Sequence, residues 1–99
     1  MNICLFCAGG MSTGLLVKNM EKYIHEHNLN HTVSAHGVGS VEYYAKDADI
    51  ILLGPQIRYK LNQVREQVKD KPITIIDTKT YGMLNGEKLM KEIIELMED

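Results

Sequence analysis

Hydrophobic and polar residues follow two alternating spacings along the chain, and each spacing predicts one kind of secondary structure. Uninterrupted apolar runs at residues 3–7 and 50–53 are typical of strands that are covered on both faces. The Ile-Thr-Ile-Ile segment at residues 73–76 predicts another strand. A Thr-Val-Ser-Ala-His segment at residues 32–36 predicts one more strand. Because helical segments separate these strands, we expect an α/β fold with four parallel strands and helices on both faces.

Four helices are predicted, one after each strand. Ser12 can cap the first helix, which we expect to end near Asn28. A short second helix is expected from Ser40, as its cap, to Ala45. In residues 57–68, apolar residues recur every three or four positions and predict one amphipathic helix. The last helix begins at Gly86, and its apolar face comprises Leu89, Met90, Ile93, Ile94 and Met97.

Composition and charge narrow the classes of protein. The 99 residues are 44% hydrophobic and 24% charged, which is typical of a globular chain, and we expect one domain over residues 1–99. A net charge of −2 favours neither nucleic acid nor an anionic membrane as a partner. Glycines interrupt the only long uncharged stretch, residues 1–17, so we expect no membrane insertion. No basic residue precedes its apolar part, and cleavage would remove the best predicted strand and helix start, so we expect no signal peptide. These features favour a cytoplasmic protein.

The segment with candidate chemistry joins the first predicted strand to the first predicted helix. It contains Cys7, three glycines and two hydroxyl residues. The glycines allow a sharp turn that brings backbone N–H groups toward an anion, and the helix start favours a thiolate and a phosphate alike. Cys7 is the candidate nucleophile; the alternative is a buried strand cysteine beside an ordinary glycine turn. The predicted phosphate-binding residues are Ala8, Gly9, Gly10, Met11, Ser12, Thr13 and Gly14.

Three known chemistries can be compared with this loop. A nucleotide-binding loop needs Lys-Ser or Lys-Thr after its last glycine, where Leu15 and Leu16 stand. A disulfide between Cys4 and Cys7 is disfavoured on an extended strand, because their Cα atoms would lie about 10 Å apart and a disulfide needs less than about 7 Å. A cysteine phosphatase needs an arginine where Thr13 stands. The loop is therefore suited to hold a phosphoryl group and lacks the residue that drives its hydrolysis.

Residues 3–13, which contain the first apolar run and the loop, resemble the active-site segment of the lactose/cellobiose-type enzyme IIB component of the bacterial phosphoenolpyruvate-dependent sugar phosphotransferase system. The resemblance continues through residues 48–57, which include Leu-Gly-Pro-Gln-Ile, and residues 76–82, so it covers essentially the whole chain. Gly14 is a departure that we expect to loosen the first helical turn. The resemblance implies a parallel sheet of order 2-1-3-4, similar to low-molecular-weight tyrosine phosphatases.

The resemblance also implies a phosphorelay. Enzyme IIA, phosphorylated on a histidine, gives its phosphoryl group to Cys7. The cysteine then passes it to a β-linked disaccharide of cellobiose, chitobiose or lactose type, which the membrane enzyme IIC holds. In the implied strand order, Gly54, Pro55 and Gln56 lie beside the loop and are expected to shape the docking surface. No cofactor is implied.

Two other groups of polar residues are interpreted as structural. Asp49 and Asp77 stand at a strand entrance and exit, where we expect turn or cap roles. Four histidines are expected to be solvated rather than metal ligands, because their spacing places no tight set on one helix face; they are His25, His27, His31 and His36. Two other functions stay open: a relative of cysteine phosphatases or arsenate reductases, and a regulatory module that signals by docking.

Overall fold

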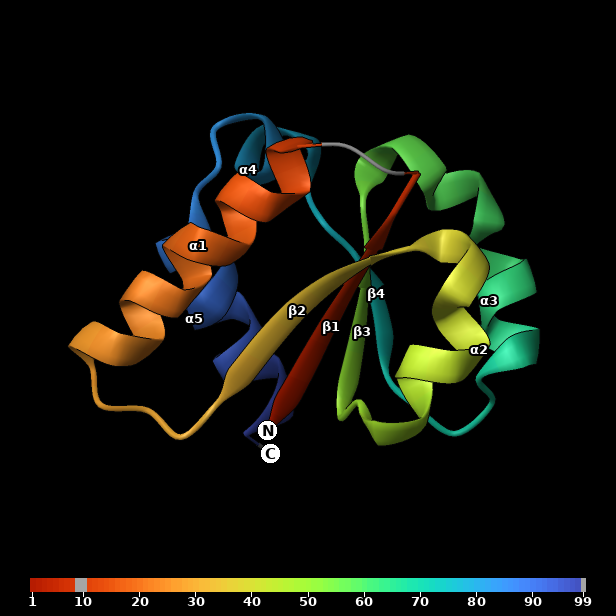
Figure 1. Ribbon diagram of the computed structural model, residues 1–99, viewed down its shortest axis with the longest axis horizontal. Coiled ribbons are helices and arrows are strands. Elements are labelled where there is room, and N and C mark those ends of the chain that lie inside the picture. Colours follow the sequence, from red (N-terminus) through yellow and green to blue (C-terminus); the bar gives the residue numbers. More distant parts are fainter. Residues whose placement is uncertain (9–10, 99) are drawn as a thin grey trace.

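Four parallel strands form one sheet in this computed structural model, which describes residues 1–8 and 11–98. The order across the sheet is β2-β1-β3-β4, so the predicted strand number and order are confirmed (Figure 1). Because all strands are parallel, their carboxyl ends lie along one edge of the sheet, at the top of Figure 1. The strands are β1 (Asn2–Cys7), β2 (Thr32–Gly37), β3 (Ile50–Leu53) and β4 (Ile73–Ile75).

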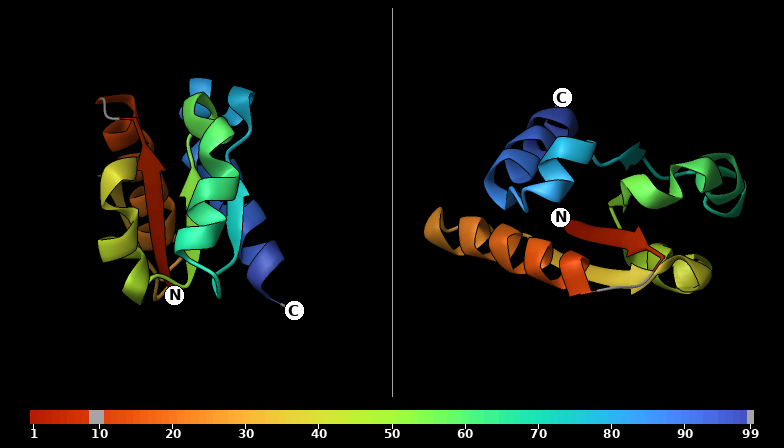
Figure 2. Two further views of the ribbon diagram at one scale, coloured as in Figure 1. Left: turned by 90° about the vertical axis from the view of Figure 1, so that its right-hand side faces the viewer. Right: turned by 90° about the horizontal axis from the view of Figure 1, so that it is seen from above.

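Helices cover both faces of the sheet (Figures 1 and 2). One face carries α1 (Met11–Glu26), α4 (Thr78–Gly82) and α5 (Gly86–Met97), and the other carries α2 (Val41–Tyr44) and α3 (Leu61–Gln67). Three short 3-10 helices complete the second side; they are η1 (Val38–Ser40), η2 (Ala45–Asp47) and η3 (Pro55–Lys60). We call these two layers the α1/α5 side and the α2/α3 side.

The central strand β1 explains why its sequence is apolar without alternation. Successive side chains of a strand point to opposite faces. Ile3 and Leu5 pack into the hydrophobic cluster under the α1/α5 side, whereas Cys4 and Phe6 pack into the cluster under the α2/α3 side. All four side chains are at most 2% exposed. The strand therefore supplies two cores at once and ends in the loop that begins with Cys7.

The predicted helix over residues 57–68 is wrong as a single element. The segment consists of the 3-10 helix η3 and the seven-residue α3, and Ile57 has non-helical angles of φ −115° and ψ 21°. Pro55 stands at the start of η3, where its fixed φ suits a tight first turn. The predicted apolar face is nevertheless directed inward, because Ile57 and Val64 are both at most 2% exposed.

The predicted helix caps are also corrected in two places. Helix α1 begins at Met11, so Ser12 lies inside the first turn rather than before it. Ser40 does precede α2, but its hydroxyl donates to the carbonyl oxygen of Gly37 at 2.8 Å and caps no N–H group. The end of α1 near Asn28 is confirmed, since Asn28 adopts a left-handed φ of 52° that terminates the helix.

The described part of the chain bears on two features that we expected to be absent, a disulfide and a membrane-spanning helix. Cys4 and Cys7 are both free thiols, as the strand geometry predicted. None of the helices within residues 1–8 and 11–98 has the length and hydropathy that crossing a membrane requires.

Candidate functional site

The candidate site lies at the carboxyl edge of the sheet, where β1 and β3 end and α1 and α4 begin (Figure 1). Cys7 is the last residue of β1 and is 7% exposed, and Ala8 after it is exposed. Gly9 and Gly10, two of the predicted phosphate-binding residues, lie outside the described residues. Helix α1 begins directly after them at Met11. Its first N–H groups have no partner within the helix and point toward this edge.

The thiol of Cys7 has a neighbour on each side of β1. Toward β2, its Sγ lies 3.9 Å from the carbonyl oxygen of His36, to which the S–H group donates. Toward β3, Gly54 donates its N–H to the carbonyl oxygen of Phe6 at 2.9 Å. A Cβ atom on Gly54 would lie 3.6 Å from the Cβ of Cys7. The structure therefore places Gly54 directly beside Cys7, as the implied strand order predicted.

The next two residues continue this neighbourhood. Pro55 begins η3, and the exposed side chain of Gln56 turns back over Gly54. The Oε1 atom of Gln56 lies 3.0 Å from the position that a Cβ on Gly54 would occupy. These residues thus line one flank of the Cys7 loop, and their role in docking stays a prediction.

Thr13 has a structural partner that sequence reasoning missed. It is 2% exposed, and its Oγ1 lies 2.9 Å from the hydroxyl of Tyr81 in α4. The Thr13 side chain is therefore already hydrogen-bonded, and the group that remains for a phosphate at this position is the backbone N–H in the first turn of α1. Tyr81 lies in the segment 76–82 that carries the resemblance, but no local pattern pairs it with Thr13, and five-residue α4 is too short to show an apolar repeat.

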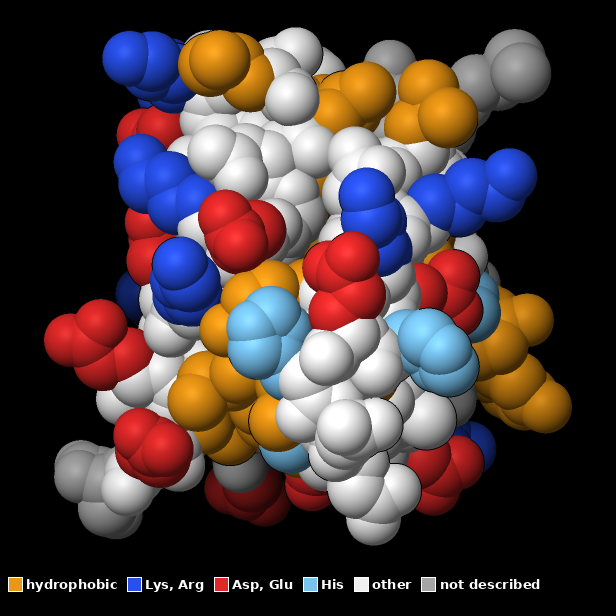
Figure 3. All heavy atoms as spheres, turned by 90° about the vertical axis from the view of Figure 1, so that its left-hand side faces the viewer, with side chains coloured by type: hydrophobic (Ala, Val, Ile, Leu, Met, Phe, Trp, Pro, Cys, Tyr) orange, Lys and Arg blue, Asp and Glu red, His pale blue; other side chains and the backbone are white. Residues whose placement is uncertain are grey.

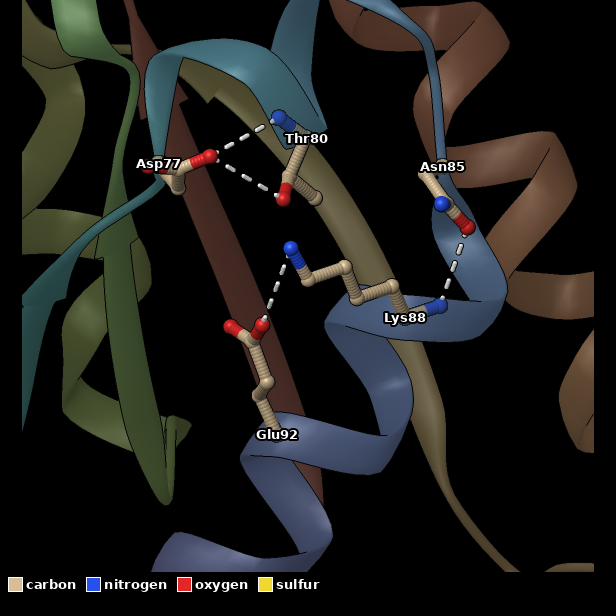
Figure 4. A network of polar contacts seen from close by, with 5 residues as sticks. All are labelled: Asp77, Thr80, Asn85, Lys88 and Glu92. Carbon is tan, nitrogen blue, oxygen red and sulfur yellow. Dashed lines mark hydrogen bonds and ion pairs between the residues drawn. The ribbon is translucent and has the colours of Figure 1, made fainter.

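Helix α4 is held in place by Asp77, which confirms the cap interpretation. Its carboxylate accepts from the backbone N–H of Thr80 at 3.1 Å and from the Thr80 hydroxyl at 3.3 Å (Figure 4). The hydrogen bond from the Thr80 N–H, helped by the nearby Lys88 ammonium, lowers the pKa of Asp77. Asn85 caps α5 in the same way through the N–H of Lys88. Asp77 is thus a structural residue of the edge that carries Tyr81.

Asp49 also has the predicted turn role. Its Oδ2 accepts from the backbone N–H of Asn2 at 2.6 Å, at the opposite edge of the sheet from Cys7. Cys4 lies on the α2/α3 side, where its Sγ is 3.7 Å from the hydroxyl oxygen of Ser34 and 3.9 Å from the carbonyl oxygen of Tyr44. The two cysteines of the chain therefore have different surroundings, and Cys7 alone adjoins the loop.

The histidines are solvated only in part. His25 and His27 are exposed on α1, as predicted. His31 and His36 are half-buried, and burial lowers the pKa of both imidazoles. The ring of His36 stacks on Tyr44 with centroids 3.6 Å apart. Among the residues that the structure describes, no group of three His, Cys, Asp or Glu side chains is placed to hold a metal ion.

Elements that follow the strands at this edge of the sheet carry exposed hydrophobic side chains. Leu15 in α1 is 51% exposed, Met83 after α4 is 68% exposed, and Tyr59 in η3 is 77% exposed. Hydrophobic side chains gather along the upper edge of the molecule when the α1/α5 side faces the viewer (Figure 3). Exposed apolar side chains on elements that lie near a reactive group are typical of a surface that meets another protein.

A model of the family described as "PTS system, Lactose/Cellobiose specific IIB subunit" matches residues 2–92. The oligo-beta-mannoside-specific EIIB component of Bacillus subtilis is 31% identical over 97 residues, which cover 96% of this chain and 94% of that protein. A solution structure of the cellobiose-specific phosphotransferase IIB component of Borrelia burgdorferi is similar with a TM-score of 0.78 and 40% identity, over 92% of this chain and 85% of that chain. The lactose-specific EIICB component of Lactococcus lactis is 26% identical over 77 residues, 78% of this chain and 14% of that protein.

Proposed function

This chain belongs to the lactose/cellobiose-specific IIB family of the phosphotransferase system, whose IIB components are phosphotransferases, and we propose that Cys7 carries the phosphoryl group. Residues 1–99 act as one IIB domain in the cytoplasm. The donor is enzyme IIA phosphorylated on a histidine. The acceptor is a β-linked disaccharide, of cellobiose, chitobiose or lactose type, bound to the membrane enzyme IIC.

The position of Cys7 carries this proposal. It ends the central strand, and the unpaired N–H groups at the start of α1 follow it after a short loop. Such N–H groups and the positive end of the helix dipole stabilise a negatively charged phosphoryl group. Cys4 lacks this setting, because its Sγ is enclosed by Ser34 and Tyr44 under the α2/α3 side. Cys7 is therefore the thiol that a donor protein can reach.

The proposed chemistry is two successive displacements at phosphorus. In the first, the Sγ of Cys7 attacks the phosphohistidine, the N–P bond breaks as the S–P bond forms, and the thiol proton ends on the imidazole nitrogen. In the second, a sugar hydroxyl attacks phosphocysteine, the S–P bond breaks as the O–P bond forms, and the hydroxyl proton ends on Sγ. The proton exchanged in each step is thus the thiol proton, which in the structure is donated in a hydrogen bond to the backbone carbonyl oxygen of His36.

Two features favour a relay over a phosphatase. A phosphatase stabilises the transition state with a bidentate guanidinium, and the residue at that position is Thr13, whose side chain is buried against Tyr81. The chain has two arginines, Arg58 and Arg65, and both are exposed in the helical segments of the α2/α3 side. We therefore expect phosphocysteine to persist until a partner arrives.

Partner choice is supported by the surface and by one relative. The exposed Leu15, Tyr59 and Met83 lie on elements that follow the strands at this edge, and they suit the docking of a protein. The EIICB relative of Lactococcus lactis, by its name, joins a C and a B component in one chain, which supports IIC as the acceptor component.

Mass spectrometry tests the assignment of the phosphorylated residue. After incubation with phosphorylated enzyme IIA, the protein should gain one phosphoryl group, which is lost in Cys7→Ser and kept in Cys4→Ala. A phosphoryl group on Cys4 or on a histidine would overturn the assignment.

Two further assays separate the alternatives. Rapid hydrolysis of an aryl phosphate by the unmodified protein would favour the phosphatase. Transfer from phosphorylated IIA to candidate disaccharides in vesicles that contain IIC supports the relay. Stable phosphorylation without such transfer, for every sugar tried, would favour the regulatory module.

A further inference from the structure

The side chain of Gln56 turns back over Gly54, beside Cys7, in a way that docking alone does not explain. Its Oε1 lies 3.0 Å from the point that a Gly54 Cβ would occupy, and the same point lies 3.6 Å from the Cβ of Cys7. The distance between the Oε1 of Gln56 and the Cβ of Cys7 is therefore at most the sum of these two distances. Since Gly54 has no side chain, no Cβ atom occupies the point that both groups adjoin.

The carboxamide of Gln56 is also available. Within residues 1–8 and 11–98 it makes no hydrogen bond, and it is exposed at the carboxyl edge of the sheet. Gln67 on the same side of the molecule differs, because its Nε2 donates to Glu42 at 3.0 Å. A carboxamide supplies two N–H donors and one acceptor oxygen, and rotation about its last side-chain bond exchanges their positions.

The carboxamide of Gln56 is close enough to bind a phosphoryl oxygen on Cys7. A phosphoryl oxygen on Sγ lies three bonds beyond the Cβ of Cys7, and a hydrogen bond spans about 2.9 Å between nitrogen and oxygen. These lengths together cover the separation between Cys7 and the carboxamide of Gln56. The N–H groups at the start of α1 approach the loop from the α1/α5 side, so Gln56 approaches from the opposite flank.

We propose that Gln56 is a ligand of the phosphoryl group on Cys7, with its Nε2 donating to a phosphoryl oxygen in phosphocysteine and in both transfer steps. This inference rests on the proposed function. Gln56 binds an oxygen that is neither attacked nor expelled, so the bonds and protons exchanged in each step are unchanged. A neutral amide binds the dianion less strongly than a guanidinium does, which suits an intermediate that must be both stable and transferable. Gly54 leaves the space that the carboxamide needs.

Two variants and a matched control test the proposal. Gln56→Ala removes the donor, and we expect phosphorylation of Cys7 by phosphorylated IIA to slow about tenfold. Gln56→Glu keeps the size and places a carboxylate against the dianion, so we expect about a hundredfold loss. Gln63→Glu makes the same charge change at an exposed position of α3 and should stay within about twofold of the parent, because exposed charges are screened.

A spectroscopic measurement separates phosphoryl binding from partner docking. The phosphorylated protein, freed of IIA, should show a downfield shift of the Gln56 side-chain N–H resonances, with those of Gln63 and Gln67 unmoved. Gly54→Ala, which retains Gln56 and displaces its carboxamide, should abolish that shift. An unmoved Gln56 resonance in the parent, or variant rates equal to the parent rate, would overturn the inference while leaving Cys7 phosphorylation intact. A parent protein that is never phosphorylated on Cys7 would instead overturn the proposed function.

Discussion

The two sides of the sheet are built differently, and the Cys7 loop lies between them. On the α1/α5 side, two long helices approach so closely that a Cβ on Gly86 would lie 2.5 Å from backbone atoms of Asn19 and Met20. Asn19 also donates from Nδ2 to the carbonyl oxygen of Leu84 at 2.8 Å. On the α2/α3 side, short helices are joined by the exposed pair of Gln67 and Glu42.

Because of this difference, the two sides contribute different parts of the site around Cys7. The α1/α5 side fixes the start of α1, because the hydroxyls of Thr13 and Tyr81 join its first turn to α4. The α2/α3 side instead presents Gly54 and an exposed Gln56 to the same loop. We infer that the first side holds the backbone anion site in place, whereas the second supplies an adjustable side chain.

The largest expected effect follows from adding one methyl group at the crossing of α1 and α5. Gly86→Ala forces backbone atoms apart, since a Cβ there would lie 2.5 Å from the carbonyl carbon of Asn19. We expect a loss of about 3 kcal/mol in the free energy of unfolding, measured by denaturant titration. Gly82→Ala, with nothing within 4 Å of the new Cβ, is the control. Equal stabilities of the two variants would show that the α1/α5 side is not closely interlocked.

The next effect concerns the hydrogen bond between Thr13, in the first turn of α1, and Tyr81 in α4. Tyr81→Phe leaves the buried Oγ1 of Thr13 without its partner, and we expect a loss of about 2 kcal/mol in the free energy of unfolding. Phosphorylation of Cys7 should also slow, because the N–H groups of that turn lose their anchor. Tyr43→Phe, at a side chain in α2 that is 69% exposed, should change neither quantity. Slower phosphorylation in Tyr43→Phe but not in Tyr81→Phe would contradict the role inferred for the α1/α5 side.

A smaller and opposite effect is expected at Gly14. This glycine lies in the first turn of α1, and a Cβ there would meet nothing within 4 Å. Gly14→Ala should therefore raise the free energy of unfolding by about 1 kcal/mol, because alanine loses less backbone entropy in a helix. Phosphorylation should continue, since the backbone N–H is kept. Gly39→Ala in η1 is the matched change on the α2/α3 side; loss of phosphorylation in Gly14→Ala alone would show that the first turn has to open.

The smallest expected effect is a dependence of stability on pH at the α2/α3 side. Burial lowers the pKa of His36 below its ordinary value of 6.5, so the folded protein binds this proton more weakly than the unfolded chain does. The free energy of unfolding should be greatest above pH 6.5 and fall as the pH drops through the lowered pKa. Thermal unfolding at several pH values should show that the free energy of unfolding falls less steeply with decreasing pH in His36→Gln than in the parent protein. His25→Gln, on an exposed part of α1, should leave the fall unchanged.

Much of this molecule was predictable because its signals are local. An apolar run such as residues 3–7 predicts a covered strand whatever surrounds it, and the alternation of strands and helices limits a small chain to a parallel α/β sheet. The cap role of Asp77 depends only on an N–H three residues later. The position of Cys7 follows equally from sequence, since a strand must end where the glycines begin.

The sequence by itself thus determined the strands, the long helices α1 and α5, and the place of Cys7 between a strand and a helix. Tertiary structure alone decided the pairing of Thr13 with Tyr81, the approach of the Gln56 carboxamide to Cys7 and the partial burial of His36. The physical reason is the range of the interactions. Periodicity and capping act over a few residues, whereas these three features depend on which side chains the packed sheet brings together from distant segments.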